Sequence, residues 1–280
     1  MTATSRDKAL SLTTSPEATP AFIRLARILR SLWHIRKIFA LPKTPDPSTR
    51  DPLSRWFESF LAILGIEVRT SGERPVATAF LIVANHTSWL DIMVLRSIFS
   101  TCFIAKEEIA KWPVVGPMAR EAGTIFIGRT RLSSFRETLA ASRKSLGKKI
   151  PITVFPEGTT TLGDRLLPFK TGVFDLCTET GSPALPVSIR YETPDGLQLT
   201  SVSYTGDEPF FRSFGRTLRE PRVVVRLHIS PPVFPEGKDR KAMALASQEA
   251  VANGLALLAS SRSSPPARQD SRSVNSPLQM

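Results

Sequence analysis

Residues 76–91, VATAFLIVANHTSWLD, join an apolar segment directly to a cluster of polar side chains. The apolar run 76–84 predicts a buried β-strand. Asn85 and His86 follow at once, and Asp91 comes five residues after the histidine. In open α/β sheets ligands bind beyond the ends of strands, so this junction predicts a functional site at one edge of a sheet.

Apolar runs and amphipathic segments alternate along the rest of the main body. The further predicted strands are 152–155, 184–191 and 223–229, and the predicted helices are 88–99, 132–148 and 239–259. This mixture indicates an α/β fold with a mixed central sheet flanked by helices. We expect the main domain to span residues 65–260, between a flexible N-terminus at 1–20 and a disordered Pro/Ser/Arg-rich tail at 261–280.

Residues 21–64 predict an amphipathic helical hairpin ahead of that domain. Wound at 3.6 residues per turn, residues 21–39 form two faces. Their apolar stripe contains Ala21, Leu25, Ile28, Leu32, Ile35 and Phe39, widened by Phe22, Leu29 and Trp33, and the opposite side contains Arg24, Arg27, Arg30, His34 and Lys37. Such a helix favours the surface of an anionic membrane, and the alternative is docking on the body with a solvated basic face. A second amphipathic helix over 53–64 follows four prolines, and we expect the whole of residues 21–64 to associate with the membrane.

Composition limits the classes of protein that need to be considered. The chain has 280 residues and a net charge of +12, and residues 1–50 hold nine Lys/Arg against three Asp/Glu. This basic N-terminal part indicates a polyanionic partner. The absence of a nucleic-acid-binding motif favours a membrane over nucleic acid. We find no secretory signal and no run of about 18 apolar residues, so we expect a peripheral protein on the cytoplasmic face of the cell membrane.

His86 and Asp91 have the chemistry of a general base and its partner. A neutral imidazole accepts a proton near pH 7, and a carboxylate on its other nitrogen fixes the tautomer. Five residues on a regular helix would place the pair about 140° apart, so we expect His86 in a turn and Asp91 in the first turn of the next helix. His34 and His228 lack a carboxylate at this spacing.

Two further blocks carry polar residues suited to a ligand. Phe-Pro-Glu-Gly-Thr-Thr-Thr (155–161) follows a predicted strand and brings Glu157, Gly158 and Thr159 toward the same rim. Cations for an anionic group come from Arg129, Arg131 and Lys170. Cys102 and Cys177 lie 75 positions apart without a CxxC motif, so we expect no metal site and no disulfide framework.

These blocks resemble the glycerolipid acyltransferase family, which acylates lysophosphatidic acid and related lysolipids. Its NHxxxxD motif is matched by Asn85, His86 and Asp91, its GxIFIxR block by residues 123–129, its FPEGTR motif by residues 155–159, and its apolar-Pro-Val block by residues 185–187. Gly128 stands where the family usually has an acidic residue, and Thr160 stands where members specific for lysophosphatidate usually have Arg.

The resemblance implies acyl transfer from a thioester to a lysolipid hydroxyl, with His86 and Asp91 catalytic and with Glu157, Gly158 and Thr159 positioning the acceptor. Arg129 or Lys170 then contributes to substrate binding. The donor is acyl-CoA or acyl carrier protein, and no cofactor or metal is implied. The favoured acceptor is 1-acylglycerol-3-phosphate, giving phosphatidic acid in phospholipid biosynthesis.

Thr160 supports an alternative acceptor, which is lyso-ornithine lipid or another lysophospholipid. A different class of function is a non-catalytic peripheral membrane protein that keeps the same fold. The intact His86/Asp91 pair and Glu157/Gly158 argue for the enzyme.

Overall fold

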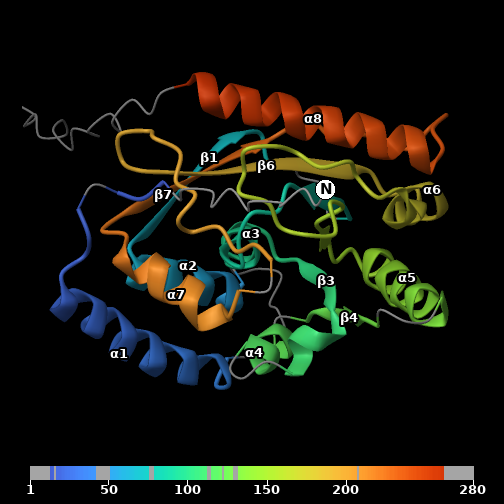
Figure 1. Cartoon of the computed structure of the whole chain (residues 1–280). Helices are drawn as coiled ribbons and strands as arrows, with labels where there is room; N and C mark the ends of the chain where they lie inside the picture. The colour runs from blue at the N-terminus through green and yellow to red at the C-terminus, as the bar shows by residue number, and fades with distance from the viewer. Residues whose placement is uncertain are drawn as a thin grey trace, which may run out of the picture.

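The computed structural model describes residues 13–15, 17–41, 51–75, 79–111, 115–121, 123–128, 132–206 and 208–261. Figure 1 shows a central sheet with helices on both of its faces. The strands are β1 (Ile66–Gly72), β2 (Leu81–Ala84), β3 (Cys102–Lys106), β4 (Ile125–Ile127), β5 (Ile152–Val154), β6 (Ala184–Glu192) and β7 (Val223–Ile229). The α-helices are α1 (Ala21–Ile38), α2 (Pro52–Leu64), α3 (Leu90–Ile98), α4 (Val115–Glu121), α5 (Leu132–Gly147), α6 (Asp175–Thr180), α7 (Phe210–Arg219) and α8 (Arg240–Ser260). Short 3₁₀ turns, η1 (Glu107–Lys111) and η2 (Thr171–Phe174), precede α4 and α6.

The sheet is mixed, which confirms the predicted fold class. Its strand order is β1-β7-β6-β2-β5-β3-β4, and neighbouring strands run parallel except for β6 and β7. Leu81 of β2 lies opposite both Ile152 of β5 and Ala184 of β6. The carboxyl ends of these three strands therefore point to one edge, as expected for a site built on parallel strands.

The two faces of the sheet are buried by different helices. Leu81 and Val83 of β2 belong to a core shared with Met243 and Val251 of α8. Ile82 and Ala84, which alternate with them, belong to a core that includes aromatic side chains of α2. Figure 1 shows the same division, with α8 along one face and α2 and α3 on the other. Burial on both faces explains why β2 is entirely apolar.

The predicted elements are found with a few differences. The strand predicted at 223–229 has those bounds, and β6 extends one residue past the prediction to Glu192. The strand predicted at 76–84 is shorter, because β2 begins at Leu81 and residues 76–78 lie outside the described part of the chain. The edge strand β1 was not predicted, since its sequence IEVRTSG becomes polar and exposed along its length.

Helices α1 and α2 pack together as the predicted hairpin, but α2 is a core helix. Pro52 is its first residue, and the carboxylate of Asp51 accepts a hydrogen bond from the Leu53 amide at its N-terminus. The same carboxylate pairs with the buried Arg96 of α3. The apolar face of α2 is buried against the body, so the expectation that residues 53–64 contact a membrane is wrong for that face.

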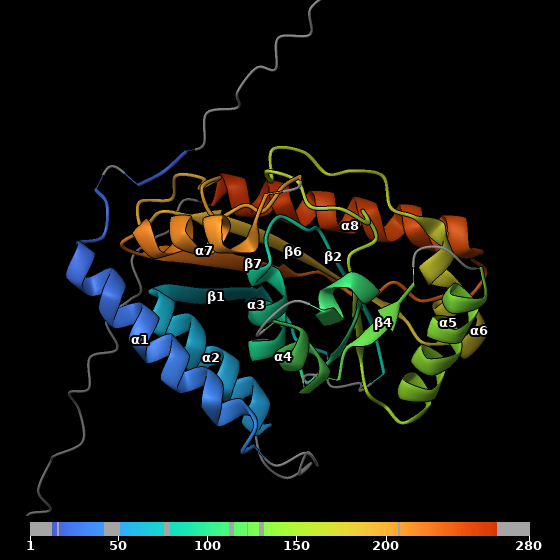
Figure 2. The same cartoon turned by 60° about the horizontal axis from the view of Figure 1, so that its bottom comes forward.

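Helix α1 docks through the side that was expected to face solvent or lipid phosphate. His34 is buried, its ring stacks on Trp56 at 4.8 Å, and its Nε2–H donates to the Trp56 carbonyl over 3.0 Å. Arg27 donates to the carbonyls of Glu220 and Pro221, both over 2.8 Å. These hydrogen bonds, which the periodicity of α1 alone does not predict, decide its orientation. Figure 2 shows α1 lying outside α2, away from the sheet.

The apolar stripe of α1 is consequently left on the outside. Its exposed large side chains are Phe22, Leu25, Leu29, Leu32, Trp33 and Phe39. We call this set the α1 apolar face. Ile28 and Ile35 differ from it, because they are partly buried against the core.

The segment before α1 is held against the body, in contrast to the flexible N-terminus expected over residues 1–20. The amide of Ser15 donates to Glu220 over 3.1 Å, and the amide of Thr19 donates to the Arg219 carbonyl over 2.7 Å. Residues 1–12, and 262–280 of the expected tail, lie outside the described residues.

Helix α8 is the one described helix that is long and apolar enough to cross a membrane by length and composition. It packs along β6 and β7, and Ser188 of β6 donates to the Val251 carbonyl of α8 over 2.8 Å. A core helix of this length passes the same test, and these contacts with the sheet make α8 a covering helix of the domain.

Candidate active site

Asn85 fixes the start of the turn that follows β2. Its Nδ2 donates to the Ile189 carbonyl over 2.9 Å, and its Oδ1 accepts from the Ile189 amide over 2.8 Å. The Asn85 side chain thus supplies Ile189 with the hydrogen bonds that the backbone of β2, which ends at Ala84, no longer provides. The chain can then turn away from the sheet while His86 stays at its edge.

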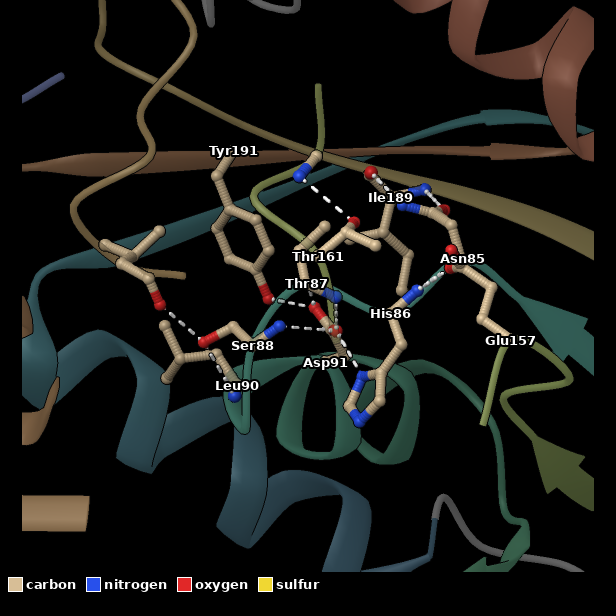
Figure 3. Close-up of polar contacts among 12 residues, drawn as sticks. Asn85, His86, Thr87, Ser88, Leu90, Asp91, Glu157, Thr161, Ile189 and Tyr191 are labelled. Atoms are coloured by element: carbon tan, nitrogen blue, oxygen red, sulfur yellow. Dashed lines mark hydrogen bonds and ion pairs between the residues drawn. The ribbon is translucent and has the colours of Figure 1, made fainter. Parts of the chain in front are cut away.

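His86 and Asp91 form the predicted pair. The Nδ1 of His86 lies 2.8 Å from Oδ2 of Asp91, which is in the first turn of α3. Because an ionised carboxylate can only accept, Nδ1 carries a proton, so in the neutral imidazole the lone pair lies on Nε2. Asp91 is fully buried, whereas the side chain of His86 is 19 % exposed. Figure 3 shows the second ring nitrogen pointing away from Asp91.

Asp91 accepts further hydrogen bonds from the turn and from β6. The backbone amides of Thr87 and Ser88 donate to its Oδ2 over 2.7 and 2.9 Å. The hydroxyl of Tyr191 donates to its Oδ1 over 2.5 Å. All three donors stabilise the ionised carboxylate. Sequence spacing did not identify Tyr191, which lies 100 residues from Asp91, although the alternation of β6 places it on the same face as the buried Leu185, Val187 and Ile189.

Glu157 braces the turn that holds His86. Its Oε1 accepts from the His86 amide over 2.7 Å and its Oε2 accepts from the Leu167 amide over 2.9 Å. The side chain is buried, and burial raises the pKa of this carboxyl above its ordinary value, although the two hydrogen bonds offset part of that rise. These contacts differ from the expected contact with an acceptor, because both oxygens are directed to backbone amides.

Gly158, Thr159 and Lys170 lie together at the rim. Gly158 has a φ of +71°, and a Cβ at this position would clash with Nζ of Lys170, so the lysine crosses directly over the glycine. The Lys170 amide also donates to the Pro156 carbonyl over 2.9 Å. The side chains of Thr159 and Lys170 are exposed. The amide of Gly158 donates to Phe155 within the turn, so it is not directed at a ligand.

Aromatic side chains flank the turn that carries His86. The ring of Phe155 stacks on His86 with centroids 3.9 Å apart and an interplanar angle of 9°. On the other side, Trp89 contacts Phe210 and Phe214 of α7, and its indole N–H donates to Ser213 over 3.2 Å. The imidazole therefore has one ring face covered and its Nε2 edge available.

The remaining sequence candidates are either outside the described residues or away from this site. Arg129 and Arg131 lie outside the described residues. Cys177 is buried, and burial raises the pKa of its thiol to about 12, which opposes its use as a nucleophile. His228 contacts Ser71 at the far edge of the sheet, over 3.1 Å. Within the described part of the chain, no group of three or more His, Cys, Asp or Glu side chains is arranged to hold a metal ion.

Comparison with known proteins shows which proteins this chain is similar to in sequence. A family model described as Acyltransferase matches residues 65–190. Lyso-ornithine lipid O-acyltransferase of Pseudomonas aeruginosa is 37 % identical over 218 residues, which cover 75 % of this chain and 81 % of that protein. 1-Acyl-sn-glycerol-3-phosphate acyltransferase of Neisseria gonorrhoeae is 37 % identical over 142 residues, which cover 50 % of this chain and 55 % of that protein.

A solved structure shares the fold. The 1-acyl-sn-glycerophosphate (LPA) acyltransferase PlsC of Thermotoga maritima superposes with a TM-score of 0.64 at 24 % identity. The match covers 87 % of this chain and 97 % of that structure. The likeness therefore extends beyond the residues that the family model matches.

Proposed function

The chain belongs to the acyltransferase family, and from that premise we propose that His86 and Asp91 transfer a fatty acyl chain from a thioester to a lysolipid hydroxyl. The observation that carries the proposal is the orientation of His86. Its Nδ1–H is bound to a buried carboxylate, its second ring nitrogen points away from that carboxylate (Figure 3), and its side chain is 19 % exposed.

The reaction needs one proton carrier and no covalent enzyme intermediate. Nε2 of His86 removes the proton of the acceptor hydroxyl while that oxygen attacks the thioester carbonyl carbon. The new C–O bond forms, the C–S bond breaks, and the departing thiolate takes the proton from the imidazolium. Asp91 holds the imidazole in the correct tautomer and stabilises its positive charge between these two transfers.

Among the described residues, the rim supports an acceptor with a negative group near its hydroxyl. Lys170 crosses the FPEG turn, and position 160 carries a neutral threonine. A single ammonium suits a carboxylate, and the ornithine head group has one carboxylate. The lyso-ornithine lipid O-acyltransferases of P. aeruginosa, Rhodobacter capsulatus and Brucella abortus align over 81, 72 and 77 % of their lengths. We therefore place lyso-ornithine lipid first among the acceptors.

1-Acylglycerol-3-phosphate is the second candidate. The N. gonorrhoeae relative with that substrate in its name supports it, although the alignment covers 55 % of that protein. This acceptor has a phosphate, which Lys170 alone would neutralise in part. The donor in both cases is an acyl thioester, carried by CoA or by acyl carrier protein.

The α1 apolar face is the proposed contact with the membrane that holds both lipids. Trp33 is 62 % exposed and Phe22 is 73 % exposed, and the ammonium of Lys37 lies 3.5 Å from the centre of the Trp33 ring. Exposed Arg30 and Arg36 flank this face. Aromatic and apolar side chains beside cations are the composition that interfacial helices favour.

The test is transfer of a labelled acyl chain in the presence of anionic vesicles. The protein is given acyl-CoA or acyl carrier protein thioesters, and lyso-ornithine lipid, lysophosphatidic acid and lysophosphatidylethanolamine as separate acceptors. His86→Ala is compared with His228→Ala, which removes a histidine far from the site. We expect product from wild type and His228→Ala, with loss in His86→Ala.

The outcomes separate the parts of the proposal. Preference for lysophosphatidic acid would overturn the order of acceptors but keep the mechanism. Equal transfer by His86→Ala would overturn the mechanism. Vesicle binding without transfer to any acceptor would support the non-catalytic membrane protein.

A further inference from the structure

Strand β6 continues past the end of its neighbour β2 and reaches the catalytic turn. Ala84, the last residue of β2, lies opposite Val187 of β6, and β6 continues to Glu192. Tyr191 is therefore placed four residues beyond that last pairing. Its side chain is 3 % exposed and belongs to the core on the α2 and α3 face.

The contact of Tyr191 with Asp91 is of a specific kind. The phenol donates to Oδ1 over 2.5 Å, while Oδ2 of the same carboxylate accepts from His86 and from two backbone amides. Figure 3 shows these donors arriving at the two oxygens from different sides. A carboxylate held at both oxygens cannot rotate about its χ2 torsion without losing a charge-assisted hydrogen bond.

The phenol remains a donor at any pH at which the enzyme works. Burial, and the negative charge of Asp91 beside it, raise the pKa of Tyr191 well above its ordinary value. The hydroxyl therefore keeps its proton, and the hydrogen bond leaves the negative charge on Asp91.

We propose that Tyr191 is a positioning residue, which holds Asp91 in register with His86 and moderates the negative charge that the imidazole experiences. The proposal rests on the proposed function, since it assigns the catalytic pair to His86 and Asp91. Tyr191 acts through Asp91 and does not contact the substrate. Without its hydroxyl, more of the carboxylate charge is directed to His86, and the imidazolium becomes harder to deprotonate.

The test is Tyr191→Phe, which keeps the buried ring and removes the hydroxyl. The matched control is Ser188→Ala, which removes a buried hydroxyl from the same strand on its opposite face, where it donates to Val251. Both variants are compared for thermal unfolding, for kcat and KM, and for the pH profile of kcat/KM. We expect Tyr191→Phe to lower kcat about tenfold, the factor that corresponds to about 1.4 kcal/mol, with KM within twofold of wild type.

The pH profile and a proton NMR signal distinguish positioning from a purely structural role. We expect the acid limb of kcat/KM to move to higher pH in Tyr191→Phe, by roughly half a unit to one unit. The Nδ1 proton of His86, identified by its absence in His86→Ala, is expected to move to lower field. Ser188→Ala should leave both unchanged.

Two results would overturn the inference. One is a Tyr191→Phe enzyme with wild-type kcat. The other is a lower kcat with an acid limb and an Nδ1 signal at their wild-type positions, because that pattern would mean that the tyrosine supports the fold alone. His86→Ala is assayed alongside, so a failure of the catalytic assignment is seen separately from a failure of this inference.

Discussion

The α1 apolar face can be tested with two pairs of leucines that are almost equally exposed. Leu29 and Leu32 on α1 are 58 % and 56 % exposed, and Leu245 and Leu257 on α8 are 59 % and 54 % exposed. Changing either pair to serine makes the same chemical change in a helix. We expect the two serine substitutions in α1 to weaken binding to anionic vesicles strongly. The two serine substitutions in α8 should leave that binding unchanged.

The exposed fractions set the size of the effect. Full transfer of a leucine side chain from water to an apolar phase contributes about 1.5–3 kcal/mol. Slightly more than half of each α1 side chain remains available for transfer, so the pair contributes about 2–3 kcal/mol. At about 1.4 kcal/mol for each factor of ten, the partition constant should fall about 30- to 100-fold.

Co-sedimentation with vesicles of phosphatidylglycerol and phosphatidylcholine measures this partition, and circular dichroism melting checks that both variants fold equally well. The expected ratio between the partition constants of the two variants is therefore about 30- to 100-fold. Equal weakening by the two pairs would refute the assignment to α1. Weakening by the α8 pair alone would transfer the lipid contact to α8, which has the composition of a membrane span.

Three further predictions concern the site. Asp91→Asn should lower kcat by about 10²–10⁴-fold in the thioester assay. It should also destabilise the fold by about 1–3 kcal/mol in melting, because the asparagine NH₂ group cannot accept from the donors around Asp91, and retention of activity would exclude the proposed role of Asp91. Lys170→Met should lower kcat/KM for acidic lysolipids about tenfold and leave a neutral acceptor such as monoacylglycerol unchanged, so equal losses would show that Lys170 does not bind the acidic group. Glu157→Gln should destabilise the fold by about 1–3 kcal/mol, because its NH₂ group cannot accept from a backbone amide. Burial holds the folded-state pKa of Glu157 above its ordinary value of 4.5. Its contribution to stability is therefore full below pH 4.5 and is lost as the pH rises through the raised folded-state pKa. In urea unfolding, the difference in unfolding free energy between wild type and Glu157→Gln should narrow from pH 4 to pH 7, and a difference that widens contradicts this sign.

The sequence predicted the contact between His86 and Asp91 because its information is local. His86 follows the end of β2 and Asp91 lies in the first turn of α3, and the four residues between them leave few ways to place the two side chains other than in contact. The same reasoning gave β7, whose alternating residues match a strand in contact with a neighbour on each side. Tyr191 could not be found in this way, because its partner is distant in sequence and the strand order must be known first.

The orientation of α1 shows a different limit. Helical periodicity separates two faces, but it does not say which of them the body will accept. The buried side is decided by partners outside the helix, namely the carbonyls after α7 that accept from Arg27 and the Trp56 ring that stacks on His34. Arg27, a basic residue expected at a lipid phosphate, instead holds α1 against the domain through its hydrogen bonds.

Two buried carboxylates, those of Asp91 and Glu157, lie in this site, and their hydrogen-bond donors differ. Asp91 accepts from His86, two amides and a phenol, so it is stabilised as an anion next to the imidazole that becomes positive in the proposed mechanism. Glu157 accepts from two backbone amides, one of them that of His86, and is fixed to the framework. The resemblance places the FPEG motif at the substrate, but in this structure Glu157 joins the motif to the backbone of His86. In the proposed mechanism Glu157 therefore acts on the acceptor by holding His86 in position. The described side chains of this rim that are exposed to a lipid head group include Lys170 and Thr159.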